Sequence, residues 1–269
     1  MPSITELRSF HRRRIAIPVR PGDLVLDVGS GDKPHWRADV LLDRFPDDEH
    51  SVQRSGAAAA RTPRPLFDAD AGAMPFADKV FDYVICSHVL EHVLDPGAAM
   101  SEMMRVGKAG YIELPVASSA RILDFPSHLW WCSVHVDADG DDVLTFDAKT
   151  ALSFHGEIDG WARSEPVHAD LQKLFAKHLT SRLITFSWTD SFRFDVRGAP
   201  TAELLADVEK LGEQHHPRED IGVRLLTKLL TLPRWRERRP RQLRMSDVLR
   251  PELVPAGDPV LESRRYTLD

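Results

Sequence analysis

The chain has 269 residues, of which 42% are hydrophobic and 28% are charged, a balance typical of folded globular proteins. Its net charge of -6 gives no reason to expect a nucleic-acid partner. Two cysteines, Cys86 and Cys132, are too few for a disulfide framework, and no apolar run has the length of a signal-peptide core or a membrane span. We therefore expect a cytoplasmic protein that neither spans a membrane nor binds nucleic acid.

The N-terminal part predicts a helix followed by a buried strand. Ser3 and Glu6 have capping-box spacing, which favours a helix over residues 4–14. Residues 24–28 form an almost wholly apolar run that stops at Gly29, a pattern typical of a parallel strand buried on both faces. This run is the first central strand of the predicted sheet.

A second strand is predicted shortly after the first. Residues 39–42 form its apolar run, and Asp43 ends it. Because so few residues separate the two strands, the helix between them can span only about residues 32–38. The polar stretch 44–65 predicts a connecting segment.

Two more strands and a helix continue the alternation. Apolar side chains over residues 79–87 and 111–116 predict buried strands, and Asp95 followed by Pro96 opens a helix between them. The methionines of this helix have helical spacing, which favours core packing over a metal site. Strand-helix-strand alternation predicts an α/β fold with a doubly wound, mostly parallel sheet.

Two hairpins are predicted in the second half of the chain. Residues 129–136 and 143–146 flank a turn-rich acidic stretch, which favours a β-hairpin inserted over the site at about 117–148. Residues 183–188 and 192–196 flank another turn and predict a second hairpin. We expect this second hairpin at the antiparallel edge of the main sheet.

Two domains follow from these patterns. Residues 1–198 are expected to form the sheet domain with its inserted hairpin, and residues 199–269 a C-terminal extension with two helices over 201–232 and a proline-rich tail. The arginine-rich segment 234–244 is either a solvated face or a site for an anionic group.

Two glycines follow the first predicted strand. Gly29, Ser30 and Gly31 stand at the carboxyl end of a buried strand, where α/β sheets bind ligands and where glycine lets the backbone approach a ligand closely. A tight turn without a ligand is the alternative. The dinucleotide fingerprint G-x-G-x-x-G fails at Pro34, which argues against NAD and FAD.

Three further motifs follow the glycine loop in order. Asp43 ends the second strand, residues 70–76 read DAGAMPF, and residues 81–92 read FDYVICSHVLEH. From about residue 24 to residue 115 the chain resembles the class I S-adenosylmethionine-dependent methyltransferases. It is similar above all to their type 11 subgroup, which is related to the quinone-biosynthesis methyltransferases and has the patterns D-A-x-x-L-P-F and F-D-x-V-x-x-x-x-V-L-E-H.

The resemblance implies a Rossmann-like methyltransferase fold, S-adenosylmethionine as the cofactor, and a set of cofactor contacts. Asp43 is expected to accept hydrogen bonds from the ribose hydroxyls, Asp70 to face the adenine amino group, and Met74 to form an apolar wall. The full set of expected cofactor-binding residues is Asp27, Gly29, Ser30, Gly31, Asp43, Asp70, Ala71, Met74, Ser87 and His88.

Methyl transfer needs few catalytic groups, because alignment of the reactants supplies much of the rate. A hydroxyl acceptor would need a general base, for which the candidates are His88, Glu113 and His128. His88 is either that base or a cofactor contact, and Glu113 either orients the acceptor or bonds the sheet end. His92 is interpreted as a buried structural histidine. No metal site is predicted, since the acidic stretch 137–142 lacks the register of a calcium loop.

The acceptor is predicted from the aromatic segment that ends in Trp130 and Trp131. Aromatic faces beside polar groups suit the CH faces of sugars, so the leading expectation is O-methylation of a hydroxyl on a small-molecule or oligosaccharide acceptor. A quinone or other aromatic small molecule is the alternative acceptor. A non-catalytic, cofactor-binding regulatory protein is the alternative of another class.

Overall fold

The computed structural model describes residues 17–44, 59–122, 125, 127–151, 160–162, 164–178, 181–214 and 241–268. The helix expected at residues 4–14 lies outside these residues, as do most of the connecting segment 44–65, residues 234–240 of the arginine-rich segment and the second of the two helices expected over 201–232.

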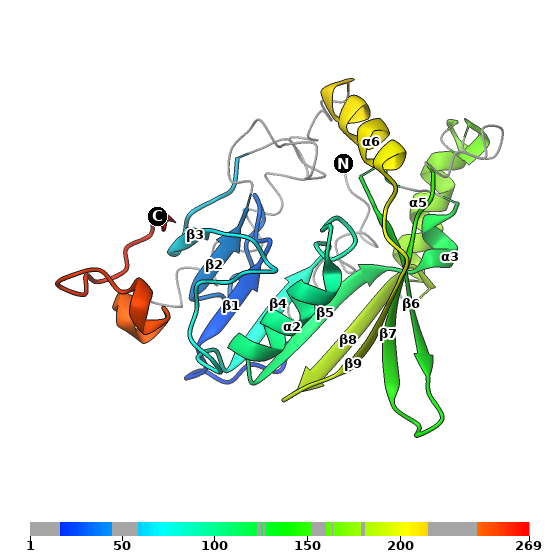
Figure 1. The fold of residues 1–269 in the computed structure, drawn as a ribbon. Helices are drawn as coiled ribbons and strands as arrows, with labels where there is room; N and C mark the ends of the chain where they lie inside the picture. The colour runs from blue at the N-terminus through cyan, green and yellow to red at the C-terminus, as the bar shows by residue number, and fades with distance from the viewer. Residues whose placement is uncertain are drawn as a thin grey trace.

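A seven-stranded sheet forms the centre of the molecule (Figure 1). Its strands, in spatial order, are β10 (Arg265–Thr267), β3 (Leu66–Asp68), β2 (Val40–Asp43), β1 (Val25–Val28), β4 (Tyr83–Ser87), β5 (Ala109–Pro115) and β8 (Leu183–Thr189). All neighbouring strands are parallel except β8, which pairs antiparallel with β5 at one edge. The predicted α/β fold with a mostly parallel, doubly wound sheet is confirmed.

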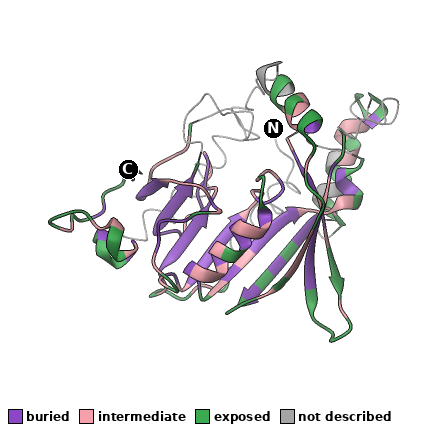
Figure 2. Ribbon diagram, viewed as in Figure 1, coloured by how far each residue is buried: buried purple, intermediate pink, exposed green. Residues whose placement is uncertain are grey.

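The strands at the middle of the sheet are buried along their whole length. Every residue of β1 and β2 is buried, and these strands are purple throughout in Figure 2. Parallel strands covered on both faces are apolar at successive positions instead of alternating with polar residues. This burial explains why the continuous apolar runs of the sequence identify the central strands.

The connection from β1 to β2 contains turns and no helix among residues 29–39. The amide of His35 donates to Oδ2 of Asp27 at 2.6 Å, and the amide of Ala38 donates to the carbonyl of His35 at 3.0 Å. The expected helix at residues 32–38 is therefore wrong. A helix this short would make too few hydrogen bonds to offset the free-energy cost of nucleating it. Pro34 also lacks the amide hydrogen that a helical hydrogen bond needs.

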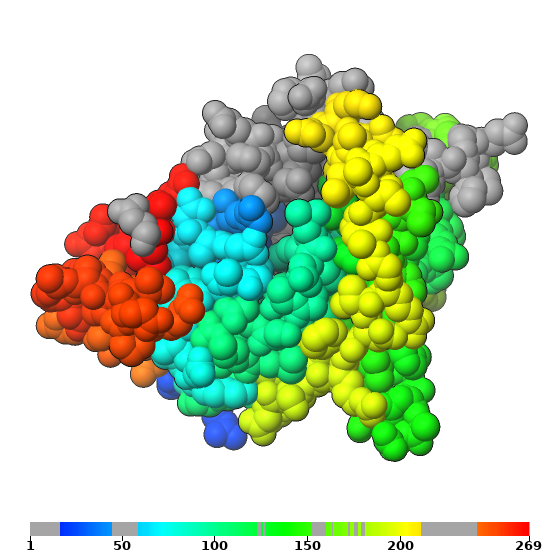
Figure 3. All heavy atoms as spheres, viewed as in Figure 1, coloured from blue at the N-terminus to red at the C-terminus, as the bar shows by residue number. Residues whose placement is uncertain are grey.

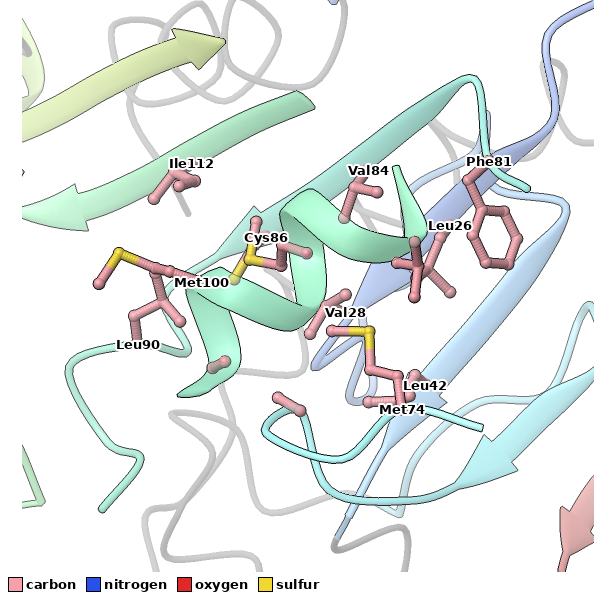
Figure 4. Packing of buried hydrophobic residues seen from close by; sticks show 14 of the residues in the cluster. Leu26, Val28, Leu42, Met74, Phe81, Val84, Cys86, Leu90, Met100 and Ile112 are labelled. Carbon is pink, nitrogen blue, oxygen red and sulfur yellow. The ribbon is translucent and has the colours of Figure 1, made fainter. Parts of the chain in front are cut away.

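Helix α2 (Pro96–Val106) covers one face of the sheet (Figure 1). It begins where predicted, because Oδ1 of Asp95 accepts a hydrogen bond from the amide of Ala98 at 2.9 Å and caps the helix. Met100 and Met103 are fully buried. In Figure 4, Met100 lies among Cys86, Leu90 and Ile112, so the methionines pack in the core as predicted.

A second sheet has three strands in the order β6 (Trp130–Val136), β7 (Asp142–Ala148) and β9 (Arg193–Arg197). Strands β6 and β7 are antiparallel and form the first predicted hairpin. Arg193 of β9 offsets part of the negative charge of the acidic turn between them, because it forms ion pairs with Asp137, Asp139 and Asp141. These carboxylates therefore help to attach β9 to the hairpin.

The second predicted hairpin is wrong in its pairing. Strand β8 takes the antiparallel edge of the main sheet as expected, but β9 pairs in parallel with β7 in the second sheet. The chain reverses sharply at Asp190, whose φ is 61°, and the following Phe192 donates its amide to Sδ of Met104 at 3.3 Å. Phe192 and Phe194 pack against the main core, which holds β9 away from β8.

Further helices within the described residues include α3 (Ala117–Ala120), α5 (Val167–Lys177) and α6 (Ala202–Gln214). Helix α6 is the first of the two helices predicted in the C-terminal extension. Among the residues that the structure describes, no helix combines the length and the apolar character that a membrane crossing requires.

Residues 241–268 pack against the main sheet. They contain two short 3₁₀-helices, η3 (Met245–Asp247) and η4 (Pro251–Leu253), and end in β10, which pairs with β3. Figure 3 shows this segment, in orange and red, against the cyan atoms of the chain around β3. Tyr266 stacks on Phe67 of β3 with ring centroids 5.3 Å apart. Part of the predicted C-terminal extension thus completes the sheet and its core.

Replacing Tyr266 by alanine is expected to lower the free energy of unfolding by about 3–5 kcal/mol, because the substitution empties a buried aromatic site between β10 and β3. Urea unfolding followed by circular dichroism measures the change. Val260→Ala is the matched control, since Val260 lies in the same segment but is 46% exposed. A change within about 0.5 kcal/mol for both variants would contradict a structural role for this segment.

Candidate functional site

The strand order places the candidate site between β1 and β4. From β1 the chain moves to β2 and then β3 on one side, and β4 begins the other side of the sheet. Doubly wound sheets bind ligands beyond the carboxyl ends of the strands at such a reversal. Here Gly29 follows β1 and His88 follows β4, so both motifs from the sequence meet at the expected place.

The glycine loop has a backbone that only glycine adopts readily. Gly29 and Gly31 have φ angles of 66° and 51°. The amide of Gly29 donates to the carbonyl of Leu42 at 2.7 Å, and the amide of Gly31 donates to Oδ2 of Asp43 at 2.8 Å. A Cβ atom on Gly29 would lie 2.2 Å from Cγ2 of Val89. The loop is therefore fixed against β2 on one side and against the segment after β4 on the other.

Several features of this loop fit a polar ligand. The hydroxyl of Ser30 is buried and has no hydrogen-bond partner among the described residues, and buried polar atoms without a partner point to a water or ligand. Asp43 is buried beside the loop, at the end of β2. Asp27 is occupied locally by the amide of His35. The loop, the hydroxyl and the Asp43 carboxylate fit a nucleoside such as the adenosyl group.

Asp70 lies at the same edge of the sheet, two residues beyond β3. Its Oδ1 accepts from the amide of Gly72 at 2.7 Å, and its Oδ2 pairs with the guanidinium of Arg44, which follows β2. Ala71 and Met74 are buried directly after it. The structure thus brings the residues expected around the ribose and the adenine to neighbouring strand ends.

A group of histidine and glutamate side chains lies at the ends of β4 and β5. We call it the His–Glu cluster, and its members are His88, Glu91, His92, Glu113 and His128. His88 has a φ of 57° and lies between the two glutamates, with Nδ1 3.1 Å from Oε1 of Glu91 and Nε2 3.2 Å from Oε1 of Glu113. Both ring nitrogens of His88 therefore face protein carboxylates.

Glu113 is held by three side chains. Besides His88, the hydroxyl of Ser87 donates to Oε1 at 3.2 Å, and the hydroxyl of Tyr111 donates to Oε2 at 2.8 Å. The residue is 1% exposed. Glu113 thus bonds side chains at the ends of β4 and β5, as in the sheet-end alternative, and its orienting of an acceptor stays a prediction.

The electrostatics of the cluster bear on the predicted general base. Burial lowers the pKa of His88, but hydrogen bonds with Glu113 and Glu91 outweigh burial and raise it to about 9. Burial raises the pKa of Glu91, whereas the three histidines around it lower it to about 2. Burial lowers the pKa of His128 to about 3. At neutral pH His88 is protonated, which favours a positioning role over proton acceptance.

The segment 127–130 is tied to the segment after β4 by three hydrogen bonds. The amide of Leu129 donates to the carbonyl of Glu91 at 2.7 Å, and Nε1 of Trp130 donates to the carbonyl of Val93 at 2.8 Å. Nδ1 of His92 lies 3.0 Å from the carbonyl of Ser127. These bonds bring His128 to the cluster from a distant part of the sequence.

The two tryptophans of this segment have different surroundings. Trp130 is 2% exposed and packs edge-to-face against Phe146. The ring of Trp131 lies against two cations, with Nζ of Lys149 4.7 Å and the guanidinium carbon of Arg121 5.3 Å from its centroid. Trp130 is therefore a core residue, and Trp131 is covered by cations of the chain itself.

Sequence analysis missed the role of Glu91. The residue was part of a matched motif, but no function was assigned to it. A glutamate three residues after His88 and directly before His92 was the available signal, because side chains three apart share a face in a helical turn. That signal is weak without the tertiary contact to His128.

The fold and the glycine loop define an α/β protein with a candidate ligand site at the switch point of a doubly wound sheet. Residues 40–112 match the family model for the methyltransferase domain. The chain is 41% identical over 112 residues to a demethylmenaquinone methyltransferase of Renibacterium salmoninarum, an alignment that covers 40% of this chain and 47% of that protein. It is 37% identical over 123 residues to the ubiquinone/menaquinone biosynthesis C-methyltransferase UbiE of Xanthomonas oryzae pv. oryzae, covering 40% and 44%.

The chain thus spans about half the length of the curated relatives it matches. Among solved structures, the chain is similar to one from the complex between the Haloferax volcanii Trm112 methyltransferase activator and the putative methyltransferase. The two chains are 16% identical, and the alignment covers 71% of this chain and 99% of that one with a TM-score of 0.38. The chain carries a domain of the class I S-adenosylmethionine-dependent methyltransferase family. The cofactor of this family is S-adenosylmethionine.

Proposed function

We propose that this protein transfers a methyl group from S-adenosylmethionine to a quinone, in its reduced form, or to another aromatic small molecule. The observation that carries the proposal is the glycine loop with the unpartnered Ser30 hydroxyl, which lies at the switch point of the sheet beside His88. The names of the matched relatives support the acceptor class, since they refer to menaquinone and ubiquinone methylation.

The proposed cofactor site uses the ends of three strands. Gly29, Ser30 and Gly31 would hold the cofactor along the loop after β1, with Asp27 below them fixing the turn. Asp43 would bind the ribose hydroxyls.

The adenine end of this site would be formed after β3 and β4. Asp70 would accept a hydrogen bond from the adenine amino group, while Ala71 and Met74 supply apolar contacts. Ser87, whose hydroxyl is fixed by Glu113, would line the side next to the reacting methyl group.

When bound, the cofactor supplies an electrophilic methyl group on a sulfonium, so the protein's task is to align the acceptor. His88 is the member of the His–Glu cluster that an acceptor can reach, because its side chain is 36% exposed whereas those of Glu91 and Glu113 are 0% and 2% exposed. We propose that His88 contacts the acceptor and that Glu113 positions it. We propose that His128, the third candidate for a general base, belongs with Glu91 and His92 and does not contact the acceptor.

The expected O-methylation of a sugar finds no support in the comparisons. Its sequence basis was the pair Trp130 and Trp131, and in the structure Trp130 is a core residue while cations cover Trp131. The relatives favour the alternative acceptor, an aromatic ring methylated at carbon. Methylation at carbon would replace a ring hydrogen, which would leave as a proton to solvent, so the reaction would need no oxidant.

The test is incubation of the protein with methyl-labelled cofactor and three acceptors, namely a reduced quinone, an oligosaccharide and an amine. Mass spectrometry should find one added methyl group on the ring of the reduced quinone. Methylation of the oligosaccharide alone would contradict the proposed acceptor. Tight S-adenosylhomocysteine binding without transfer to any acceptor would favour a regulatory protein instead.

Asp70→Ala is expected to weaken S-adenosylhomocysteine binding at least tenfold, because it removes a hydrogen-bond acceptor worth about 1.5 kcal/mol or more at the proposed adenine contact. Titration calorimetry measures the affinity. Asp78→Ala is the matched control, since Asp78 is 76% exposed and pairs with Arg105 away from the strand ends. An unchanged affinity in a folded Asp70→Ala protein would remove Asp70 from the site.

A further inference from the structure

Three metal-ligating side chains of the His–Glu cluster converge on one point. Nε2 of His92 and Nε2 of His128 each lie 4.0 Å from Oε1 of Glu91. One ligand atom from each of the three residues lies within 4.8 Å of the other two. The residues come from the segment after β4 and from the segment before β6, so no single sequence motif contains all three of them.

Glu91 is the unusual member of this group. It is fully buried, and its Oε2 accepts no hydrogen bond among the described residues. A buried carboxylate oxygen without a donor is costly and calls for an unseen partner. His88 contacts only the other oxygen, Oε1. The oxygen that faces the two histidines is Oε1, so a cation between them would satisfy Oε2 only by binding both oxygens of the carboxylate.

His92 is arranged as a metal-bound histidine is. Metal-bound histidines commonly donate their second ring nitrogen to a carbonyl, which fixes the ring and directs the lone pair of the other nitrogen at the metal. His92 makes this contact, with Nδ1 3.0 Å from the carbonyl of Ser127, and its Nε2 faces Glu91. The hydrogen bonds from Leu129 to Glu91 and from Trp130 to Val93 hold His128 in place opposite.

We propose that Glu91, His92 and His128 bind a divalent transition-metal ion of the Zn²⁺ type. Two imidazoles and one carboxylate form a ligand set found in zinc enzymes, and three protein ligands leave at least one position for a water molecule. A tetrahedral zinc ion with bonds of about 2.0 Å separates its ligand atoms by about 3.3 Å. The two 4.0 Å separations would therefore each close by less than about 1 Å, and the third, which is at most 4.8 Å, by up to about 1.5 Å. The site stands independently of the acceptor proposed above.

The test uses the full chain, stripped with EDTA and dialysed into metal-free buffer. Titration with Zn²⁺ against a chromogenic chelator should give one tight site per chain, and Co²⁺ should give the visible absorption bands of a four-coordinate ion. A thermal unfolding midpoint that rises with added Zn²⁺ gives a second readout. Absence of stoichiometric binding to the unaltered chain would overturn the proposal without affecting the methyltransferase assignment.

Variants then locate the ion. His128→Ala and His92→Ala should each weaken Zn²⁺ binding by about 10²-fold or more and alter the Co²⁺ bands, since each removes a direct ligand. His135→Ala is the matched control, because His135 is an exposed histidine on β6 outside the group. Circular dichroism shows which variants are folded. Loss of the site in His135→Ala, or its full retention in a folded His128→Ala protein, would overturn the assignment.

Discussion

A His88→Ala variant should lose about 3 kcal/mol of its free energy of unfolding near neutral pH. Glu91 and Glu113 are buried, and each faces one nitrogen of the His88 ring. Removing one partner of a buried ion pair leaves an uncompensated buried charge, which costs about 3–5 kcal/mol. The lower end applies because the His88 side chain is 36% exposed. Urea unfolding followed by circular dichroism measures the loss.

Backbone strain must be separated from the loss of the ring, because His88 has a φ of 57°. His88→Gly accepts this conformation without strain, and His88→Asn accepts it while keeping a polar donor. The glycine variant should therefore lose most of the same stability, and the asparagine variant less. Equal stability of the glycine variant and the unaltered protein would show that the ring contributes nothing.

The same variants separate the proposed contact of His88 with the acceptor from its predicted contact with the cofactor. If His88 positions the acceptor, kcat should fall by about 10²-fold while the affinity for S-adenosylhomocysteine stays nearly constant, because misplacing a reactant is costly and the cofactor contacts remain. Weaker S-adenosylhomocysteine binding with unchanged kcat at saturation would instead place His88 in the cofactor site.

Gly29→Val is expected to reduce the affinity for S-adenosylhomocysteine at least tenfold and to destabilise the fold. A side chain at this position strains a backbone with a φ of 66°, and even its Cβ would lie 2.2 Å from Cγ2 of Val89. The loop must then shift, and with it the amides of Gly29 and Ser30 that bond the carbonyl of Leu42. Calorimetry measures the affinity and urea unfolding the stability.

A second comparison uses two variants with smaller changes, the single variant Gly29→Ala and the double variant Gly29→Ala/Val89→Ala. Together they distinguish an effect on packing from an effect on ligand binding. The Val89→Ala change removes the methyl group that a Cβ at residue 29 would meet. We expect the double variant to recover part of the stability but not the affinity, since the left-handed strain of the loop remains. Recovery of full affinity in the double variant would mean that residue 29 acts only through packing.

Local features were predictable from the sequence because their causes are local. The apolar runs at β1 and β4 indicate strands that are buried on both faces. Asp95 followed by Pro96 indicates the N-cap and the first turn of α2. The same reasoning failed at residues 32–38, where a helix was expected by analogy with longer crossovers. The spacing of β1 and β2 shows that such a connection needs only turns.

Strand partners were less predictable because pairing is decided by distant residues. The sequence of residues 183–197 does not indicate that β9 pairs with β7 instead of β8. That pairing depends on the ion pairs of Arg193 with the acidic turn and on the packing of Phe194 against the main core. Strand β10 is likewise short and has one buried residue, Tyr266, so its sequence does not indicate a strand. The strand is evident only in the structure, where Tyr266 stacks on Phe67 of β3.

By itself the sequence determined the α/β class, the ends of the central strands and the glycine loop, and hence where we expect a cofactor to bind. These follow from periodicity and from residues whose backbone preferences are local. Only the tertiary structure decided how the buried charges are grouped. His128 reaches Glu91 because three hydrogen bonds join two segments more than thirty residues apart, and the charge of each member depends on neighbours that the chain order does not reveal.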